Sequence, residues 1–519
     1  MVKWISSLPS KQLLGVRIPP GAQKHKIMKI SQSQVPNEVS RITETLEKAG
    51  FEAWIVGGCV RDLFVGRKPK DWDITTSATP EQIQSLFENT FYTNEFGTVG
   101  IVNENVSDET LKVVEATPYR VEGKYSDARR PDAVTFSQKI EDDLKRRDFT
   151  INALAYSVSH GTLLDLYGGE KDIVEGVIRA VGDPMERFEE DALRILRAIR
   201  LSAELNFSIE PATKDSMRRC AEQLGKISKE RIRDEFIRIV NSQKPMNALI
   251  LADSVGVLRF ISPELEKGTG IMQNQAHSFD VFEHNIRSLQ HAADKEWPFI
   301  IRLAALFHDV GKPTSRRWSE VKKDWTFHGH EVVGARIAKK ALENLKFSRE
   351  TIDKTVNLIR WHMFFSDPDQ VTLSAVRRVI ANVGRDNIED LINLRICDRI
   401  GTGRPKEQPF RFRKYQSMIA QALRDPISVG MLAIDGKALM EITGEKPGPR
   451  LGWMLHALLE DVLDDASRNT TEYLHNRAKE LSALPDKDLR AIGEEGKERK
   501  EEAEEADIKE IRKQFFVDK

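Results

Sequence analysis

The sequence predicts an α+β protein in which a small mixed sheet with helices is followed by a long, almost entirely helical chain. Short apolar runs typical of strands alternate with helical segments between residues 51 and 175. From about residue 184 to the end, apolar residues recur with the period of a helix. The length of 519 residues suggests three or four domains.

Composition and charge exclude several classes of protein. Apolar residues make up 40% of the chain and charged residues 31%, which excludes a disordered or collagen-like protein. The net charge of −1 means that any nucleic-acid site must be a local patch. No apolar run approaches the length of a membrane span, and Cys59, Cys220 and Cys397 are too scattered to form a disulfide framework. We therefore expect a cytoplasmic protein without a membrane partner.

The N-terminal residues differ from the rest of the chain. Residues 1–27 are basic, rich in Ser, Pro and Gly, and have no clear period. They are expected to form a loose tail, or to be an extended reading frame before a start at Met28. An amphipathic helix then ends at Gly50.

The first domain is predicted from local signals. Thr79-Pro80-Glu81-Gln82 is a capping box with proline at the first helical position, so a helix should follow it. A glycine turn at Gly57-Gly58 separates a strand from a helix. The expected strands are Phe51–Val56, Trp72–Thr75, Gly97–Val102 and Leu111–Thr117, and the expected helix after the turn is Cys59–Phe64.

Glycine-containing segments indicate the later boundaries. Candidate boundaries lie at Gly268–Gly270 and at Gly401–Pro409. The charge-rich run Glu494–Lys513 favours a solvated or partly disordered helix. The predicted division is a head over 28–175, a helical neck over 176–265, a helical domain over 270–400 and a helical tail region over 401–519.

Asp71 and Asp73 are the first candidate catalytic residues. Side chains at positions i and i+2 of a strand project from the same face. Two converging carboxylates need a positive partner, and magnesium prefers oxygen ligands. The Gly57-Gly58 turn would let backbone amides approach a triphosphate, with Arg61 close by. Glu115, inside an apolar strand, would share the metal site, or would face solvent on an edge strand.

These residues resemble a known family. The Gly-Gly turn and the Asp-Trp-Asp motif look like the signature of the class II tRNA nucleotidyltransferase and poly(A) polymerase family, which belongs to the polymerase-β-like superfamily. The resemblance covers residues 28–265. It continues in order through Arg146–Ala153, Asp165–Asp172, Glu190–Arg194 and Glu230–Glu235.

The resemblance implies a polymerase-β-like head and addition of nucleotides to an RNA 3′ end. Two magnesium ions held by Asp71 and Asp73 would assist attack by the RNA 3′-hydroxyl, and pyrophosphate would leave. Arg147, Asp148 and Asn152 would contact the nucleotide sugar and phosphates. The segment Tyr119–Ser137 matches a mobile loop beside the catalytic site.

Asp191 and Arg194 are the candidate base-reading pair. They lie three residues apart on a segment, Arg187–Leu201, that is predicted to be one helix, so they should share a face. Outside this family an intrahelical salt bridge would explain them. Within it, an acceptor beside a donor matches the edges of cytosine and adenine and rejects uracil and guanine. The resemblance thus implies addition of C and A to tRNA from CTP and ATP. A poly(A) polymerase or a CC- or A-adding enzyme stays an alternative.

Histidines and acids form a second candidate site in the helical half. The sequence His308-Asp309 follows the apolar helix Phe299–Phe307, and imidazole with carboxylate ligands suits manganese, nickel, zinc or iron. The pattern resembles the HD phosphohydrolase superfamily, which implies metal-dependent phosphatase or 2′,3′-cyclic phosphodiesterase activity. By this resemblance one metal would be held by His284, His308, Asp309 and Asp398, and a second by His330 and His362, with His328 competing with His330.

Two points stay open. The segment Lys446–Gly452 near the C-terminus would either contact phosphates or only connect helices. A protein of another class, an HD phosphohydrolase or an RNA-binding protein with an inactive transferase head, is the main rival. The intact Asp71, Asp73, Asp191 and Arg194 argue against it. The oligomeric state is not predicted.

Overall fold

The computed structural model describes residues 30–93, 97–122, 134–275, 278–364, 371–424 and 429–517. The chain falls into two compact units, Met1–Val356 and Asn357–Lys519, and the division lies inside helix α17 (Arg349–Trp361). The tail predicted over residues 1–27 and the start predicted at Met28 lie outside the described residues. Within them, no helix is both long enough and apolar enough to cross a membrane.

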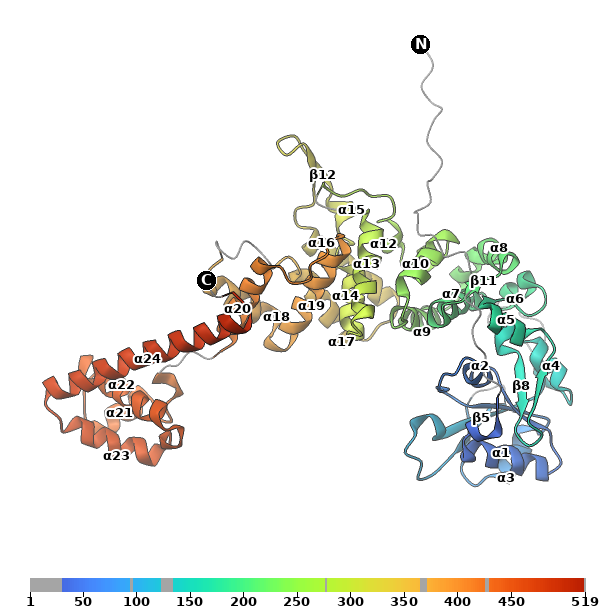
Figure 1. Cartoon of the computed structure of the whole chain (residues 1–519), viewed down its shortest axis with the longest axis horizontal. Coiled ribbons are helices and arrows are strands. Elements are labelled where there is room, and N and C mark those ends of the chain that lie inside the picture. The colour runs from blue at the N-terminus through green and yellow to red at the C-terminus, as the bar shows by residue number, and fades with distance from the viewer. Residues whose placement is uncertain are drawn as a thin grey trace, which may run out of the picture. The chain divides into compact units, whose positions relative to one another are not determined.

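The head, drawn in blue to teal in Figure 1, contains a mixed sheet. This sheet has seven strands in the order β3-β4-β5-β2-β1-β8-β9. Only the pair β2 and β5 is parallel among these neighbours. In that pair Asp73 lies directly opposite Glu115. The strands are β1 (Ala53–Val56), β2 (Asp73–Thr76), β3 (Thr90–Tyr92), β4 (Val99–Val102), β5 (Val113–Pro118), β8 (Leu154–Ser157) and β9 (Thr162–Asp165).

The helices of the head confirm the local signals. In the capping box, Thr79 Oγ1 accepts from the Gln82 N–H at 3.4 Å. Gly57 has a φ of 84°, a left-handed conformation that favours glycine and turns the chain from β1 into α2. The helices are α1 (Asn37–Lys48), α2 (Gly58–Phe64), α3 (Pro80–Leu86), α4 (Ile140–Lys145) and α5 (Gly169–Glu175).

The loop prediction for Tyr119–Ser137 is wrong at both ends. Strands β6 (Arg120–Glu122) and β7 (Val134–Phe136) pair there as an antiparallel hairpin. Residues 123–133, the centre of the predicted loop, lie outside the described residues.

The neck differs from the sequence prediction at Asp191. The predicted helix Arg187–Leu201 is two helices, because Asp191 adopts an extended conformation (φ −145°, ψ 102°) between them. Its carboxylate accepts the N–H of Leu193 at 3.0 Å and thereby caps the second helix. The helices of the neck include α6 (Pro184–Glu190), α7 (Leu193–Leu205), α8 (Pro211–Cys220), α9 (Lys229–Val240) and α10 (Pro245–Ser254).

The rest of the first unit carries the histidine motif. Helix α14 is almost entirely apolar and most of it is buried. His308, which directly follows it, is buried as well. The elements are α13 (Val281–Asp294), α14 (Phe299–Phe307), α15 (Lys312–Ser315), β12 (Arg317–Ser319), β13 (Asp324–Thr326), α16 (His330–Asn344) and the first part of α17.

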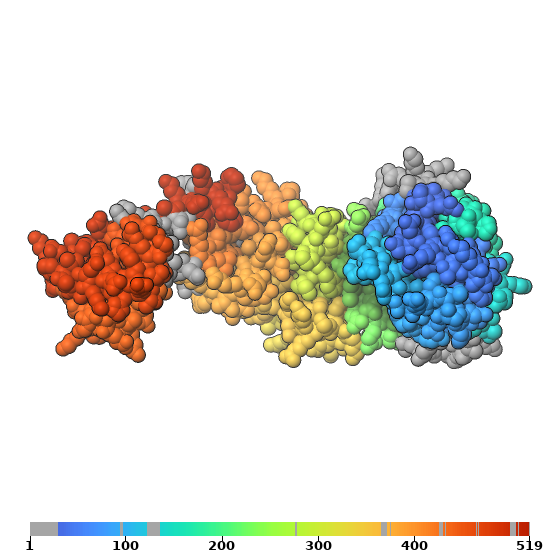
Figure 2. All heavy atoms as spheres, turned by 90° about the horizontal axis from the view of Figure 1, so that it is seen from below, coloured from blue at the N-terminus to red at the C-terminus, as the bar shows by residue number. Residues whose placement is uncertain are grey.

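The second unit is helical. Helices α21 to α24, drawn in orange-red in Figure 2, share one apolar core. The far end of α24 contacts α20 through Arg413, which donates to the Phe515 carbonyl. The helices include α18 (Leu373–Val383), α19 (Ile388–Gly401), α20 (Phe410–Leu423), α21 (Gly436–Thr443), α22 (Pro449–Asp464), α23 (Thr471–Ser482) and α24 (Asp486–Gln514).

The charge-rich run lies in α24. Glu494 and Glu495 are exposed as predicted, but Gly493 and Gly496 on the opposite face are buried against α22. Arg450, in the segment with two predicted roles, donates to Glu445 and to the carbonyls of Ser482 and Leu484. These contacts favour the connecting role for this arginine.

Candidate functional site

Three carboxylates meet at one end of the parallel strand pair. Asp73 begins β2 and lies opposite Glu115, which is on a strand flanked by β2 and β4. The edge-strand alternative for Glu115 is therefore wrong. Asp71 precedes β2 and is exposed, so the prediction that both aspartates lie within one strand is also wrong.

The ionisation of these acids shows that the carboxylates repel one another. Burial and the negative charge of Asp71 raise the pKa of Asp73 to about 7, although Arg147 acts in the opposite direction. Burial and Asp71 also raise the pKa of Glu115. A bound divalent cation would relieve this repulsion, so the oxygen-rich donor set fits magnesium.

The glycine turn lies against this group. A Cβ atom on Gly57 would lie 2.9 Å from Arg147 Nη1 and 3.8 Å from Asp73 Oδ2. A side chain at this position would therefore push the arginine away from the carboxylate. On Gly58, a Cβ would lie 3.6 Å from Arg61 Nη2. The turn thus brings backbone, two arginines and the acids together.

Four of the predicted nucleotide-binding residues lie around this turn, and three of them form a chain of hydrogen bonds. Arg61 donates to Asn152 Oδ1 at 2.6 Å, and Asn152 donates to Asp148 Oδ1 at 3.0 Å. The fourth residue, Arg147, donates to Asp143 at 2.9 Å. Asp143 thus orients Arg147, and Arg197 orients Asp148. Neither Asp143 nor Arg197 was predicted to be a site residue.

Arg197 neutralises Asp148. Its Nε donates to Asp148 Oδ2 at 2.8 Å. Burial alone would raise the pKa of Asp148, but the charge of Arg197 and the hydrogen bond from Asn152 hold it well below its usual value. Asp148 is thus an ionised acceptor at neutral pH.

Asp191 and Arg194 each have their own partners. Arg194 donates to Glu190 Oε2 at 2.6 Å and to the carbonyls of Arg187 and Arg146, at 3.1 Å and 3.0 Å. The ion-pair partner of Arg194 is therefore Glu190 and not Asp191. The intrahelical Asp191–Arg194 salt bridge, which was the alternative explanation for this pair, is not formed.

Asp191 is held instead by Arg231 on α9. Arg231 Nη2 donates to Asp191 Oδ2 at 2.6 Å. Arg231 belongs to the family motif Glu230–Glu235, but no role was predicted for it. Its place in that motif was the signal that could have identified it. The contact with Asp191 leaves no local pattern in the sequence, because it joins residues 40 positions apart.

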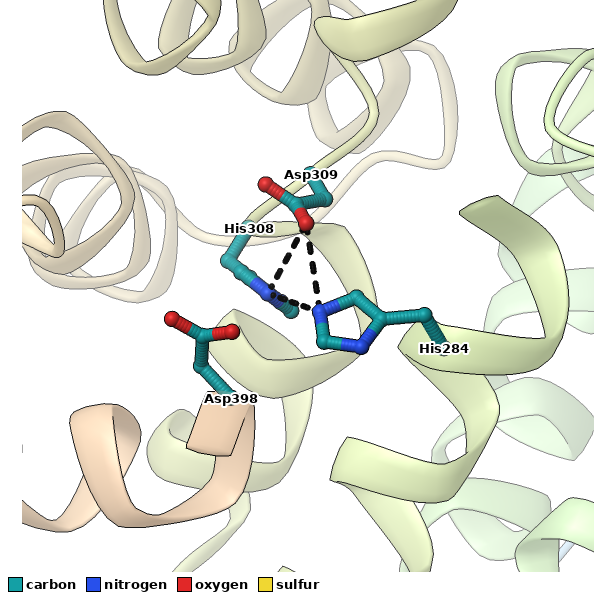
Figure 3. A group of neighbouring side chains, drawn as sticks. All are labelled: His284, His308, Asp309 and Asp398. Atoms are coloured by element: carbon teal, nitrogen blue, oxygen red, sulfur yellow. Dashed lines mark hydrogen bonds and ion pairs between the residues drawn. The ribbon is translucent and has the colours of Figure 1, made fainter. Parts of the chain in front are cut away.

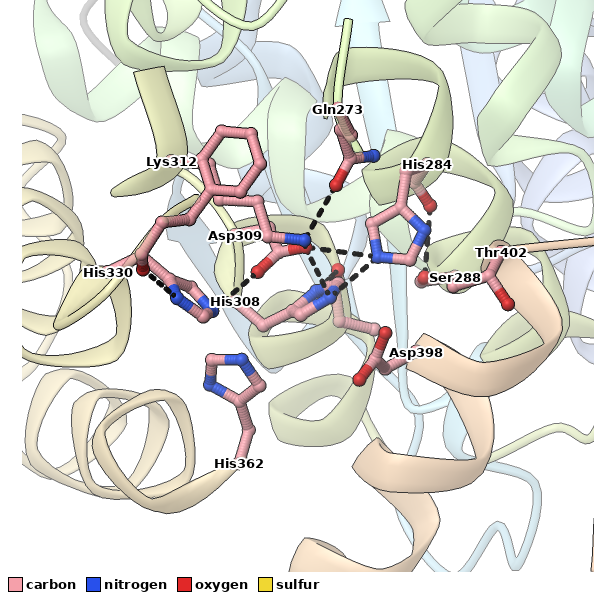
Figure 4. A network of polar contacts seen from close by, with 12 residues as sticks. Gln273, His284, Ser288, His308, Asp309, Lys312, His330, His362, Asp398 and Thr402 are labelled. Atoms are coloured by element: carbon pink, nitrogen blue, oxygen red, sulfur yellow. Dashed lines mark hydrogen bonds and ion pairs between the residues drawn. The ribbon is translucent and has the colours of Figure 1, made fainter. Parts of the chain in front are cut away.

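The histidine motif converges in the first unit. His284 Nε2 lies 2.9 Å from His308 Nε2 and 3.2 Å from Asp309 Oδ2 (Figure 3). On the other side of the carboxylate, His330 Nε2 lies 3.1 Å from Asp309 Oδ1 (Figure 4). One carboxylate therefore links three histidines that are separated in sequence.

Backbone carbonyls fix the tautomers of two of these rings. His308 Nδ1 donates to the Ala305 carbonyl and His330 Nδ1 to the Phe327 carbonyl, each at 2.8 Å. Since a carbonyl only accepts, each ring in its neutral form carries its lone pair on Nε2, as metal-ligating histidines do. His328 is exposed, whereas His330 is buried, so the geometry favours His330 over its competitor.

Lys312 completes the surroundings of Asp309. Its Nζ lies 2.5 Å from Asp309 Oδ2 and donates to Gln273 Oε1 at 2.6 Å. Burial opposes ionisation of Asp309, but the charges of Lys312 and His308 outweigh it and hold the pKa well below the usual value.

The donor set fits a transition metal. Ligand atoms of His284, His308 and Asp309 all lie within 4.8 Å of one another, and all three side chains are buried. At 2.9 Å, His284 Nε2 and His308 Nε2 can either share a proton in a hydrogen bond or both bind one cation.

The two remaining predicted ligands belong to the second unit. His362 directly follows α17 and donates from Nδ1 to the Ile359 carbonyl at 2.7 Å, so in its neutral form the ring also carries its lone pair on Nε2. Asp398 lies on α19 and forms an ion pair with Arg395. Both side chains are buried.

Comparison with known families separates three parts of the chain. The Poly A polymerase head domain matches residues 53–179, and a probable RNA- and SrmB-binding site of polymerase A matches residues 206–268. The HD domain matches residues 277–402, a range that contains all six predicted HD ligands.

Full-length relatives match as well. The CCA-adding enzyme of Levilactobacillus brevis is 47% identical over 432 residues, which cover 81% of this chain and 92% of that enzyme. The CCA-adding enzyme of Lactobacillus delbrueckii subsp. bulgaricus is 33% identical over 442 residues, which cover 84% of this chain and 96% of that enzyme. The structure of the Bacillus stearothermophilus CCA-adding enzyme in complex with CTP matches with a TM-score of 0.55 and 26% identity, covering 86% of this chain and 98% of that one.

The head fold, the carboxylate site and the HD domain define a nucleotidyltransferase with an appended HD domain. The chain belongs to the class II tRNA nucleotidyltransferase and poly(A) polymerase family, among its CCA-adding enzymes. This confirms the resemblance and the fold class predicted from the sequence.

Proposed function

We propose that this chain adds C and A to the 3′ ends of tRNA from CTP and ATP without a nucleic-acid template. The relatives named CCA-adding enzymes and the related structure with CTP support this activity. The observation that carries it is the convergence of Asp71, Asp73 and Glu115 beside the Gly57 turn, with the pKa of Asp73 raised to about 7.

The residues have distinct roles in the proposed reaction. A bond forms between the RNA 3′-oxygen and the α-phosphorus, the bond from that phosphorus to the bridging oxygen breaks, and pyrophosphate leaves. Asp71 and Asp73 would hold magnesium, which supplies charge neutralisation at the reacting phosphate. Glu115 supports the same site from β5. Arg61 and Arg147 bind the nucleotide phosphates.

The ionised Asp148 is suited to select ribose. Its carboxylate would accept a hydrogen bond from the nucleotide 2′-hydroxyl, a group that deoxynucleotides lack. Arg197 and Asn152 keep this acceptor charged and oriented.

Asp191 and Arg194 are proposed to read the base. Asp191 accepts from the exocyclic amine of cytosine or adenine, and Arg194 donates to the neighbouring ring nitrogen. Uracil and guanine present a carbonyl to Asp191 and an N–H to Arg194, so acceptors and donors face like groups. This pair accepts both C and A.

The test is incorporation into tRNA that lacks its 3′ end, with each nucleotide supplied separately and then together. Addition of C from CTP, followed by A only on transcripts that already end in CC, is expected. Repeated A addition would identify a poly(A) polymerase, and addition of only C or only A would identify the narrower enzymes. An inactive head would add nothing.

We further propose that the HD domain is a metal-dependent phosphohydrolase. His284, His308 and Asp309 would hold one metal together with Asp398, and His330 and His362 would serve a second. Support comes from the HD family match, which spans both units, and from the fixed tautomers of His308, His330 and His362. Manganese, nickel, zinc or iron would bind these ligands and activate water for attack on a phosphoester.

This second activity can be separated from the first. In the double variant His308→Ala/Asp309→Ala two adjacent ligands are lost, so metal analysis should find no transition metal and phosphoester hydrolysis should disappear. Nucleotide addition should continue, because the carboxylate site shares none of these ligands. If a folded double variant loses nucleotide addition, the two sites are not independent.

A further inference from the structure

The β12–β13 hairpin lies between two residues that contact Asp309. We call the cluster of His284, His308, Asp309 and His330 the HD centre. Lys312, just before the hairpin, contacts Asp309 Oδ2, and His330, just after it, contacts Asp309 Oδ1. The paired strands join Arg317 to Thr326. Because both ends of this short segment are fixed to the same carboxylate, its base lies at the HD centre, while the hairpin projects from the first unit (Figure 1, label β12).

The hairpin exposes an aromatic surface. Trp318 is 48% exposed and Val321, at the tip, is 95% exposed. Trp318 packs edge-on against Trp325, with ring centroids 5.3 Å apart, and the Arg316 guanidinium lies 3.7 Å above the Trp325 ring. Trp318 is thus held in place by Trp325, although about half of its surface remains open to solvent. A fixed, exposed indole is a platform for another flat group.

The hairpin is also basic. Residues 316–326 contain four basic and two acidic side chains. Both acids are engaged: Glu320 pairs with Lys323 at 2.9 Å, and Asp324 accepts from the Gln275 N–H at 3.1 Å. Arg317 and Lys322 are exposed and carry the excess positive charge.

We propose that the β12–β13 hairpin binds the single-stranded 3′ end of an RNA and directs its terminal phosphate to the HD centre. Stacking on aromatic side chains with basic groups beside the backbone is how proteins hold unpaired nucleotides. A duplex does not fit this surface, because its bases are already stacked. This inference rests on the proposed hydrolase function and names the substrate class of that site: RNA oligonucleotides rather than isolated nucleotides.

Binding is tested by photocross-linking on the full chain. The probe is a hexaribonucleotide with a 2′,3′-cyclic phosphate end and 4-thiouridine as its penultimate nucleotide. We expect a cross-link on the peptide containing Trp318, in addition to cross-links on the head, and its loss in Trp318→Ala. Cross-links confined to other parts of the chain would overturn the proposal.

Kinetics separate recognition from structure. For the hexaribonucleotide, Trp318→Ala should raise KM about tenfold with kcat unchanged, as loss of one stacked base predicts. Hydrolysis of 2′,3′-cyclic AMP, which has no preceding nucleotide to stack on the hairpin, should not change, and Trp318→Phe should restore most of the loss. An equal loss for both substrates would mean that Trp318 only supports the fold, which contradicts the proposal.

Two pairs of exposed lysines, one on the hairpin and one on α16, give a variant and its matched control. Lys322→Ala/Lys323→Ala should raise KM for the oligonucleotide, whereas Lys339→Ala/Lys340→Ala, which removes two exposed lysines from α16, should not. If both pairs act alike, the effect is one of net charge and the hairpin is not the binding site. If the wild type hydrolyses neither substrate, the hydrolase function fails, and the cross-linking result alone decides whether the hairpin binds RNA.

Discussion

Arg231 holds the carboxylate of Asp191 from the neighbouring helix. Its Nη2 lies 2.6 Å from Oδ2 and its Nη1 lies 3.3 Å from Oδ1, while the Leu193 N–H donates to Oδ1 at 3.0 Å. Both oxygens of the proposed base-reading acid are therefore oriented by fixed donors. The break between α6 and α7 and the position of α9 together place this carboxylate.

Replacement of Arg231 should weaken base selection without abolishing addition. Arg231→Gln removes the charged partner of Asp191, so we expect a smaller preference for C and A over U and G and a lower kcat. Arg231→Lys should restore part of the preference. The measurement is kcat/KM for each nucleotide on tRNA lacking its 3′ end. Arg219→Gln, which breaks an exposed pair with Asp215, is the control and should leave the preference unchanged.

Removal of Asp191 itself should have a larger effect. Asp191→Ala deletes the acceptor for the exocyclic amine and removes the repulsion of a carbonyl, so C and A addition slows and U and G are rejected less well. One recognition hydrogen bond to a charged group is worth roughly 1–3 kcal/mol, a loss of about ten- to a hundredfold in discrimination. Intact discrimination in this variant would mean that the base is read elsewhere.

The Asp148–Arg197 pair should make the stability of the head depend on pH. Because the folded pKa of Asp148 is lowered, its stabilising contribution is complete above its unfolded pKa of about 3.9 and is lost as the pH falls through the folded pKa. Scanning calorimetry of the full chain at pH 5 and pH 3 should show a larger loss of transition temperature in the wild type than in Asp148→Asn. Equal losses would show that this pair contributes nothing to acid unfolding.

Helix α24 should tolerate no side chain at Gly493. A Cβ there would lie 2.6 Å from Trp453 Cα, so Gly493→Ala should destabilise the second unit by about 1–3 kcal/mol. Gly452→Ala is the matched control on α22, where nothing lies within 4 Å, and alanine should be neutral or stabilising. Urea unfolding of both variants checks this. If Gly493→Ala leaves the free energy of unfolding unchanged, α22 and α24 can move apart at little cost, which contradicts this prediction.

The sequence predicts best where the signal is local. The capping box at Thr79 and the periodic apolar residues of α1 specify their helices without help from distant residues. Strands β8 and β9 were not predicted, because four-residue strands carry too little pattern and form only when a partner is present. That partner is β1 for β8, and β8 for β9.

The candidate sites follow the same rule. Asp71, Asp73 and Glu115 were predicted to share one metal site, with an exposed edge strand as the alternative for Glu115. The register of β5, which adjacent residues do not determine, decides between the two by placing Glu115 opposite Asp73. The single helix across Asp191 was a wrong prediction, since periodicity does not reveal a side chain that caps the next helix. The roles of Arg231 and Arg197 depend on tertiary packing.

Single-turnover incorporation of labelled CTP into tRNA lacking its 3′ end, by Asp71→Asn and Asp73→Asn, tests the central claim most directly. Each variant removes one negative ligand of the proposed magnesium site and should slow incorporation by at least about a hundredfold while the fold survives. Glu104→Gln, at an exposed acid of the same domain, should react at the wild-type rate. Incorporation by Asp71→Asn or Asp73→Asn at a rate near that of the wild type would contradict the assignment of nucleotide addition to these carboxylates.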